Sequence, residues 1–365
     1  MLEKLAKERR IIAGVVIALA AALALVTAGC GGGTVKPVGQ TGANQSSGSQ
    51  ITLNGAGSTF DLPLFSKMFS EYSKDNPNVR VNYQGVGSGA GIKQLSDETI
   101  DFGATDAPMK DEEMAAAKGG KIIHLPVTLG AVAVSYNIPN IQKGLRIAPD
   151  VLVDIFLGKI TKWNDKRIVA DNPGVKLPDL AINTAHRSDG SGTTDIFTSY
   201  LSSISPEWSN KVGKGKSVNW PNGVGGKGNA GVAAAVQQTP GTIGYVELAY
   251  ASQNDIPYAE IKNKAGKWVS PSLEGVSAAA EGVTIPDDMR VSIVNAAGEK
   301  AYPISGFSWV IVYQKQADKA KGEALVKLLS WMINDGQKYS EPLDYAKLPK
   351  SLIEREDAMI KSITY

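Results

Sequence analysis

The chain has 365 residues, of which 43% are hydrophobic and 20% are charged, so it can bury a sizeable core divided between two domains or lobes. Its 38 basic and 36 acidic residues become equal in number once residues 1–29, with four basic and two acidic residues, are set aside. This balance argues against nucleic-acid binding through a global positive field, so any affinity for anions must be local.

The amino terminus has the features of a secretory signal. Four basic residues lie among the first ten, and an apolar run from residue 11 to 29 ends in small residues before Cys30, the only cysteine. The segment resembles a bacterial lipoprotein signal, with residues 1–29 removed and Cys30 lipidated, although Thr27 stands where Leu is usual. A plain cleaved signal and an uncleaved membrane anchor are the alternatives. Residues 30–50, rich in Gly and polar residues, predict a flexible tether.

From residue 51 onward, strand and helix patterns alternate. Period-two or apolar runs predict strands at residues 51–53, 79–83, 99–102, 127–136, 180–182, 244–250 and 304–313. Helical spacing predicts helices at residues 62–72, 92–95, 150–157, 195–201, 230–238 and 319–333, with a polar tail after the last. Such alternation with short connections is typical of an α/β fold, in which ligands gather beyond the carboxyl ends of strands. The strand at 127–136 is long enough to pass from one lobe to another.

Three stretches rich in Gly and Ser each connect a predicted strand to a predicted helix. They are GAGSTF at 55–60, GVGSGAG at 85–91 and RSDGSGTT at 187–194. Free N–H groups and the helix dipole make such a helix start attractive to anions. Arg187 would add a planar, permanent charge, and Asp189 is close enough in sequence to hold it. Taken alone, RSDGSGTT is equally consistent with an ordinary capped turn and a surface Arg.

Together the three stretches predict one site for a tetrahedral oxyanion, which we call the anion cradle. Its predicted members are Thr59, Phe60, Ser88, Asp106, Arg187, Ser191, Gly192 and Thr193. Asp106 would repel a fully ionised anion but would accept a hydrogen bond from a ligand that carries a proton, so it would admit protonated phosphate and penalise sulfate. The alternative for Asp106 is a turn residue that caps the backbone.

The sequence matches the known catalytic motifs only in part or not at all. The chain has two histidines, His124 and His186, and no cluster of His, Cys and carboxylates with metal-ligand spacing. Ser191 lacks the flanking glycines of a nucleophile elbow, although His186 could serve as its base. A dinucleotide fingerprint at Gly223, Gly225 and Gly228 follows a poor strand, and Lys227 lacks the Ser or Thr of a phosphate loop. A secreted phosphatase or phosphoryl-transfer enzyme and a surface adhesion or scaffold protein remain as alternatives to a binding protein.

The motifs also resemble a known family, the phosphate-binding (PstS) proteins of bacterial phosphate-specific ABC transporters. The matching segments include GAGSTF, VNYQGVGSGAGIKQL, DFGATDAPM, LGKITKWND, RSDGSGTTDIFTSYL, NWPNGVGGKGNAGVAAAVQ, GTIGYVELAYA and LDYAKLP, in that order. The resemblance implies a type II periplasmic-binding-protein fold of two α/β lobes, which close over one phosphate. It implies lobes of residues 51–128 plus 299–365 and of residues 129–298, with the chain crossing near 124–130 and 298–304.

The resemblance also implies residue roles. Backbone N–H groups of Thr59 and Phe60, Ser88 and the segment from Ser191 to Thr193 would bind phosphate oxygens, Asp106 would accept the ligand proton, and Asp189 would pair with Arg187. His186 stands where some members carry a second Arg, which implies less positive potential at the rim. The family role further implies a monomer that binds inorganic phosphate without a cofactor or metal. It would deliver the ligand to membrane permease subunits from the periplasm or the outer face of the membrane.

Overall fold

The computed structural model describes residues 50–142 and 144–365. The predicted signal peptide (1–29), Cys30 and the tether up to residue 49 therefore lie outside the described residues. Among the helices of the described residues, none is long and apolar enough to cross a membrane.

The fold is built on one sheet of eight strands in the order β2-β1-β3-β11-β4-β8-β6-β7. Their bounds are β1 Ile51–Gly57, β2 Val79–Gly85, β3 Phe102–Thr105, β4 Ile122–Tyr136, β6 Asn183–Arg187, β7 Val224–Gly226, β8 Thr242–Glu247 and β11 Ser305–Tyr313. The β1, β2 and β3 strands run parallel to one another, as do β6, β7 and β8, whereas β4 and β11 run antiparallel to their neighbours. A second sheet contains β5 (Arg146–Ile147), β9 (Glu260–Lys262) and β10 (Trp268–Val269).

Strand β4 joins the two halves of the eight-stranded sheet. It pairs with β11 from Ile122 to Ala131 and then with β8 from Val132 to Tyr136. All 15 of its residues are buried, as expected for a strand covered on both faces. The predicted long strand at 127–136 is thus confirmed, and it begins five residues earlier than its apolar alternation indicates.

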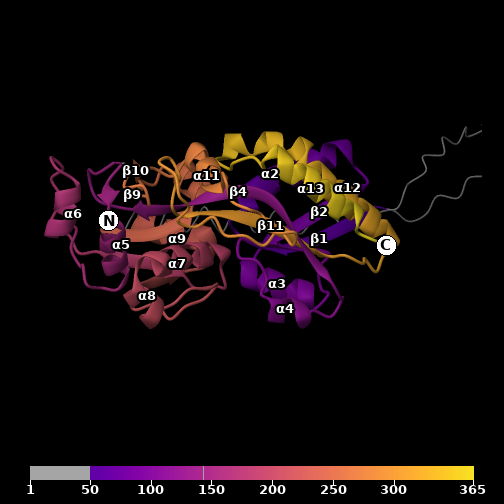
Figure 1. Cartoon of the computed structure of the whole chain (residues 1–365), viewed down its shortest axis with the longest axis horizontal. Helices are drawn as coiled ribbons and strands as arrows, with labels where there is room; N and C mark the ends of the chain where they lie inside the picture. The colour runs from indigo at the N-terminus through magenta and orange to yellow at the C-terminus, as the bar shows by residue number, and fades with distance from the viewer. Residues whose placement is uncertain (1–49, 143) are drawn as a thin grey trace, which may run out of the picture. The chain divides into compact units, whose positions relative to one another are not determined.

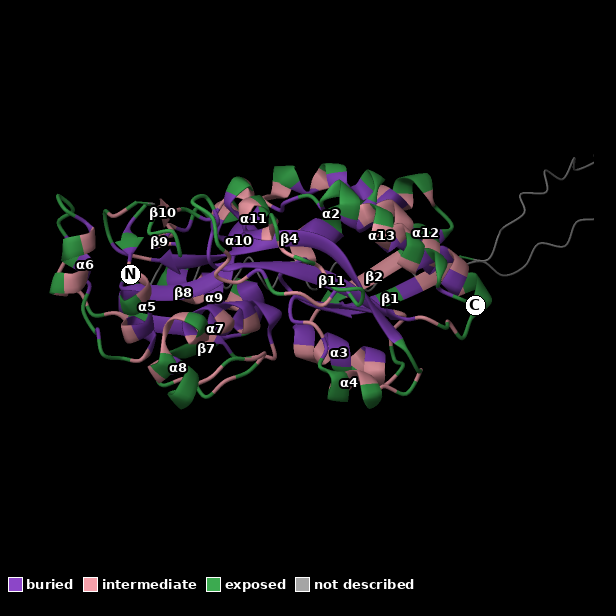
Figure 2. Cartoon of the chain, in the orientation of Figure 1, coloured by how far each residue is buried: buried purple, intermediate pink, exposed green. Residues whose placement is uncertain are grey.

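The helices cover both faces of the sheet, which confirms the predicted α/β class (Figure 1). Beside β1, β2 and β3 lie α2 (Leu62–Asp75), α3 (Ser88–Ser96), α4 (Asp111–Ala115), α12 (Lys319–Ile333), the short helices η1 (Asp335–Tyr339) and η2 (Glu341–Leu343), and α13 (Lys350–Lys361). In α2 the predicted apolar stripe is buried: Leu64, Phe65, Met68, Phe69 and Tyr72. Figure 2 shows the same division, with buried strands at the centre and exposed residues on the outer sides of α12 and α13.

The remaining helices belong to the half of the sheet that contains β8, β6 and β7. They are α5 (Pro149–Phe156), α6 (Lys166–Asp171), α7 (Gly192–Ile204), α8 (Pro206–Lys211), α9 (Gly228–Gln238), α10 (Leu248–Gln253) and α11 (Leu273–Ala280). Aromatic rings fill the space between them, with Phe197 stacked on Tyr245 at 4.3 Å between centroids. These contacts fix the start of α7, where the third Gly/Ser stretch lies.

Several predicted elements are wrong in position or type. Strand β3 begins at Phe102 rather than residue 99, because its pairing with β1 starts at Gly55 opposite Phe102. The apolar run at 180–182 pairs with residues 161–163 outside the sheet, and the sheet strand is instead Asn183–Arg187. The predicted strand at 244–250 becomes helical after Glu247. The tail contains α13, whose buried stripe of Leu352, Glu356 and Ile360 includes a carboxylate and so hides its amphipathic pattern.

Candidate anion-binding site

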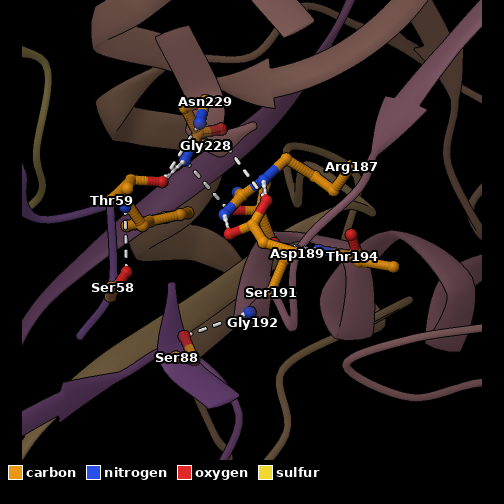
Figure 3. A network of polar contacts seen from close by, with 12 residues as sticks. Ser58, Thr59, Ser88, Arg187, Asp189, Ser191, Gly192, Thr194, Gly228 and Asn229 are labelled. Atoms are coloured by element: carbon orange, nitrogen blue, oxygen red, sulfur yellow. Dashed lines mark hydrogen bonds and ion pairs between the residues drawn. The ribbon is translucent and has the colours of Figure 1, made fainter. Parts of the chain in front are cut away.

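The three predicted Gly/Ser stretches meet at one place in the structure. Ser88 Oγ, at the start of α3, accepts a hydrogen bond from Gly192 N–H at 3.1 Å (Figure 3). Gly89 N–H donates to the carbonyl oxygen of Gly190 at 2.9 Å, so the second and third stretches are joined by backbone as well. The first stretch reaches the same place through Thr59, whose hydroxyl accepts bonds from Asn229 at the start of α9.

Close approach explains two of the glycines in these stretches. A Cβ on Gly192 would lie 2.4 Å from Asp106 Oδ2, so only glycine lets the start of α7 come this near to the carboxylate. Gly87 has φ 94°, and a Cβ there would lie 2.3 Å from Asp189 Oδ2. The glycines therefore bring N–H groups and carboxylates together across the site.

The start of α7 has the capped geometry expected of an anion site. Ser191 is its N-cap residue, and Ser191 Oγ accepts a hydrogen bond from Thr194 N–H at 3.1 Å. Gly192 N–H, in the first turn, donates to Ser88 Oγ of the cradle, where the dipole of this 13-residue helix adds positive potential. Ser191, Thr193 and Thr194 are all at most 1% exposed, so this potential acts in a site with little solvent.

Arg187 ends strand β6 and forms the expected ion pair with Asp189. Its Nε and Nη2 donate to the two carboxylate oxygens of Asp189 at 2.8 and 2.6 Å (Figure 3). Its Nη1 donates to Thr193 Oγ1 at 3.3 Å. Burial would raise the pKa of Asp189, but the bonds and charge of Arg187 and the Gly228 N–H lower it below the ordinary value. The pair holds the guanidinium plane in one orientation, with its side chain only 1% exposed.

The first stretch contributes Thr59 and Phe60, both buried. Thr59 Oγ1 accepts from the backbone N–H and the side-chain Nδ2 of Asn229 at 3.1 and 3.0 Å. Phe60 N–H donates to Ser58 Oγ at 2.8 Å. Like Ser88 and Thr193, these groups already have hydrogen-bond partners within the protein. A ligand would therefore replace those partners.

Asp106 follows β3 and is surrounded by hydroxyl groups. The Ser58 hydroxyl donates to Asp106 Oδ1, Thr193 Oγ1 lies 3.4 Å from Oδ2, and Ser308 Oγ lies 3.3 Å from Oδ1. Asp106 is 3% exposed, and burial raises its pKa to about 6 against the lowering effects of Ser58 and of the Arg187 charge. An aspartate in this state is an acceptor at neutral pH and a donor in mild acid.

All eight residues predicted for the anion cradle thus lie in one buried cluster, and the structure adds three that the sequence analysis missed. These are Ser58, Asn229 and Ser308. Ser58 lies inside GAGSTF, and Asn229 lies where the quoted Gly-rich motif enters α9, so position in a quoted motif was an available signal for both. Ser308 lies in the buried strand β11, where the sequence offers no mark that separates it from a packing residue.

The histidines occupy other environments. His186 stacks on Trp220 at 4.8 Å between ring centroids, and its Nδ1 lies 3.0 Å from the Arg187 carbonyl oxygen. No hydrogen bond joins His186 to Ser191 in the part of the chain that the structure describes. His124 accepts a bond from Met109 N–H at 3.1 Å, and burial lowers its pKa to about 4. Across residues 50–142 and 144–365 there is no group of three or more His, Cys, Asp or Glu residues that could hold a metal ion.

The dinucleotide alternative is also unsupported by the geometry. The strand before the Gly-rich turn, β7, has only three residues. Glu247 lies about 20 residues after the fingerprint, where a dinucleotide site would place an acidic ribose ligand. It is fully buried and hydrogen-bonded to Ala249 N–H and Tyr345. Its carboxyl group is therefore unavailable to a nucleotide.

Comparisons with known proteins identify the family of the chain. The model of the PBP superfamily domain matches residues 41–335. The phosphate-binding protein PstS of Xylella fastidiosa (strain 9a5c) is 45% identical over 311 residues, which cover 84% of each chain. The phosphate-binding protein PstS of Methanocaldococcus jannaschii is 42% identical over 335 residues, which cover 85% of each chain.

A solved structure shares the fold. The high affinity periplasmic phosphate-binding protein PfluDING, bound with phosphate, superposes with a TM-score of 0.68 at 22% identity, over 84% of this chain and 93% of that one. At this identity the likeness establishes the architecture, whereas the curated relatives establish the family. The chain belongs to the PstS family of phosphate-binding proteins, within the PBP superfamily.

Proposed function

We propose that the chain binds inorganic phosphate in the anion cradle and delivers it to the membrane permease of an ABC transporter. The observation that carries the proposal is the convergence of Arg187, the capped start of α7 and the acceptor Asp106 in one buried cluster. Relatives at 42% to 45% identity are named phosphate-binding proteins, which supports the same ligand here.

In this proposal, donors from the three stretches surround the phosphate oxygens. The N–H groups of Thr59, Phe60, Gly192 and Thr193 would donate, together with the hydroxyls of Thr59, Ser88, Ser191 and Thr193. Arg187 would make the charged contact, held in position by Asp189. Because several of these groups now bond to one another, binding would exchange existing hydrogen bonds for bonds to the ligand, and the net affinity would be the difference between the two sets.

Asp106 would select the ligand. At neutral pH its carboxylate would accept the O–H of a protonated phosphate, while sulfate, which has no proton to donate, would leave a buried charge facing another charge. Discrimination would therefore depend on the ionisation of Asp106, whereas affinity would depend mainly on Arg187 and the N–H groups.

We propose further that the chain forms two lobes, residues 51–128 plus 299–365 and residues 129–298. The exchange of β4 partners between Ala131 and Val132 supports a crossing near 124–130, and the start of β11 at Ser305 supports a second crossing near 298–304. The cradle would then take Thr59, Phe60, Ser88 and Asp106 from one lobe and Arg187, Ser191, Gly192 and Thr193 from the other. Phosphate would stabilise the closed form because only that form brings both sets into contact.

The lipid anchor, the location and the protein partners of the chain are further parts of the proposal. We propose that Cys30 carries a lipid, that the monomeric protein works in the periplasm or on the outer face of the membrane, and that permease subunits are its protein partners. Radiolabelled fatty-acid incorporation should disappear in Cys30→Ser if the anchor exists. The enzymatic alternative has no support in the contacts of Ser191 and His186 described above.

Calorimetry tests the proposed function directly. Titration with phosphate should give saturable binding with one site per chain, and sulfate at the same concentration should bind far more weakly. Absence of phosphate binding, or equal affinity for the two anions, would overturn the proposal.

A further inference from the structure

Asp61, directly after Thr59 and Phe60, is a buried carboxyl group with no role in the cradle described so far. It is the N-cap residue of α2, yet its side chain makes no capping bond. Instead Asp61 Oδ2 lies 2.7 Å from Ser308 Oγ, and Asp61 Oδ1 has no hydrogen-bond partner among the described residues. Its exposed fraction is 0%, so water does not solvate it. An ionised carboxylate in this position would be costly, whereas a protonated one is not.

Ser308 links this carboxyl group to Asp106. Its oxygen lies 2.7 Å from Asp61 Oδ2, 3.2 Å from the Thr105 carbonyl oxygen and 3.3 Å from Asp106 Oδ1. A serine hydroxyl has one proton to donate and can also accept. If both carboxyl groups were ionised, Ser308 could serve only one of them. A proton on Asp61 Oδ2 can be donated to Ser308 Oγ, which leaves the Ser308 proton for Asp106 Oδ1.

The charges around Asp61 point the same way. The titratable groups that interact with it are Tyr83 of β2, Asp106 after β3, Glu247 of β8, Tyr250 of α10 and Tyr345 before α13. Arg187, the cation that acts on Asp106, is already paired with Asp189. With Asp61, Asp106, Glu247 and Asp189 all ionised, the cluster would set four negative charges against the one positive charge of Arg187. Such a cluster would repel an anion.

We propose that Asp61 is a positioning residue for anion recognition: its protonated carboxyl group donates to Ser308, and Ser308 in turn donates to Asp106, which stays ionised as the acceptor of the ligand O–H. This inference rests on the proposed phosphate binding. Burial and the neighbouring Asp106 carboxylate both raise the pKa of Asp61 well above its ordinary value, which agrees with the geometry. Asp61 thus holds the proton that would otherwise compete for Asp106.

Two substitutions test the chain of hydrogen bonds. Asp61→Asn keeps a neutral donor toward Ser308, so phosphate affinity and its pH profile should stay within about threefold of the parent. Asp61→Leu removes the donor and should weaken phosphate binding more than Asp61→Asn does. Ser308→Ala should shift the acid limb of phosphate binding upward by roughly half to one pH unit, because Asp106 loses a donor to its ionised form.

A matched control is available on the same strand. Ser305 is also fully buried on β11, but its hydroxyl donates to the Tyr302 carbonyl oxygen at 2.8 Å and takes no part in the chain. Ser305→Ala should change thermal stability in the same direction as Ser308→Ala and leave the pH profile unchanged. A shift of equal size in both variants would show that Ser308 acts only in packing, and this would overturn the proposal.

The protonation state is read without phosphate by infrared spectroscopy. The difference spectrum between the parent and Asp61→Asn at neutral pH should contain the carbonyl stretch of a protonated carboxyl group. Carboxylate bands in its place would overturn the inference even if phosphate binds. Presence of the protonated band together with no phosphate binding would support the state of Asp61 and refute the proposed function instead, so the two failures are distinguishable.

Discussion

The two sides of the cradle each carry an aspartate, Asp189 half-buried and Asp106 fully buried, and the pKa values of these two aspartates move in opposite directions. Asp189 receives two hydrogen bonds and a full charge from Arg187, which lower its pKa despite burial. Asp106 is surrounded mainly by hydroxyl groups, and burial raises its pKa to about 6. Burial acts on both carboxyl groups, but it is more complete at Asp106, and only Asp189 has a guanidinium bonded to both of its oxygens.

The contrast divides the work of binding. Under the proposed function, the permanently charged guanidinium of Arg187 would supply affinity. Asp106, with its pKa raised by burial to about 6, would change between acceptor and donor and so would supply selection. Substitutions on the Arg187 side should therefore leave the preference among anions largely unchanged. Substitutions on the Asp106 side should leave phosphate affinity largely unchanged.

The largest effect is expected from Arg187→Ala. Phosphate affinity should fall by roughly 1.5 to 3 kcal/mol, the scale of a hydrogen bond to a charged group, while the preference for phosphate over sulfate persists. Calorimetry with both anions measures it. Arg167→Ala is the control, because Arg167 also pairs with an aspartate, Asp154 at 2.6 Å, but lies outside the cradle. Retained affinity in Arg187→Ala would contradict the role of the charge.

Asp106→Asn should have a smaller effect on phosphate and a larger one on selectivity. The amide can donate to a sulfate oxygen, so sulfate should gain affinity and the phosphate-to-sulfate ratio should fall by about tenfold or more. In the parent protein the same change should be produced by pH: below about 6, protonated Asp106 becomes a donor and sulfate binding should strengthen. Asp106→Asn should abolish that pH dependence. An unchanged ratio would refute the proton-acceptor role.

The sequence predicts the cradle better than it predicts the elements that carry it. Glycines and short polar side chains at helix starts form a local pattern, so RSDGSGTT and GVGSGAG could be singled out from their own residues, although RSDGSGTT alone is equally consistent with a capped turn. Strand β3 was displaced by three residues because its register depends on β1 and β11, which are distant in sequence. Helix α13 was missed because Glu356 interrupts its apolar face.

Long-range polar contacts form the part of the site that sequence reasoning could not reach. Ser308 is 202 residues from Asp106, and Asn229 is 170 residues from Thr59. Each looks ordinary in its own segment, a serine in a buried strand or an asparagine at a helix start. Only the folded chain shows that they complete the surroundings of the cradle.

An ion pair between the two proposed lobes should have a modest effect on the rate of phosphate dissociation. Glu113 of α4 pairs with Lys216 at 2.9 Å, and the two residues belong to different proposed lobes. Glu113→Gln keeps the hydrogen bond from Lys110 N–H but removes the charge, so phosphate should dissociate about two- to fivefold faster, consistent with ~0.5–1 kcal/mol for a half-buried pair. Stopped-flow kinetics measures the rate. Glu112→Gln, at an exposed position on the same helix, should leave dissociation unchanged; equal rates in both variants would exclude a role for the pair in closure.

Substitution of Glu356 should not change phosphate binding, so this residue tests the effect of burial on a carboxyl pKa apart from ligand binding. It is fully buried, and neither carboxylate oxygen has a partner among the described residues. Burial raises the pKa of Glu356 well above its ordinary value, so the folded state binds its proton more tightly than the unfolded state. Its contribution to the free energy of unfolding is therefore present at low pH and is lost as pH rises toward the folded-state pKa.

Glu356→Gln, which stays neutral at every pH, should consequently become more stable relative to the parent as pH rises. We expect its relative free energy of unfolding to increase by roughly 1 kcal/mol between about pH 5 and pH 8, measured by denaturant titration at both values. Glu354→Gln, at an exposed position on the same helix, should show no such trend. An opposite slope would mean that Glu356 has an ionised state stabilised by a partner, as Asp189 has. Burial without a partner would then no longer account for the difference between the two sides of the cradle.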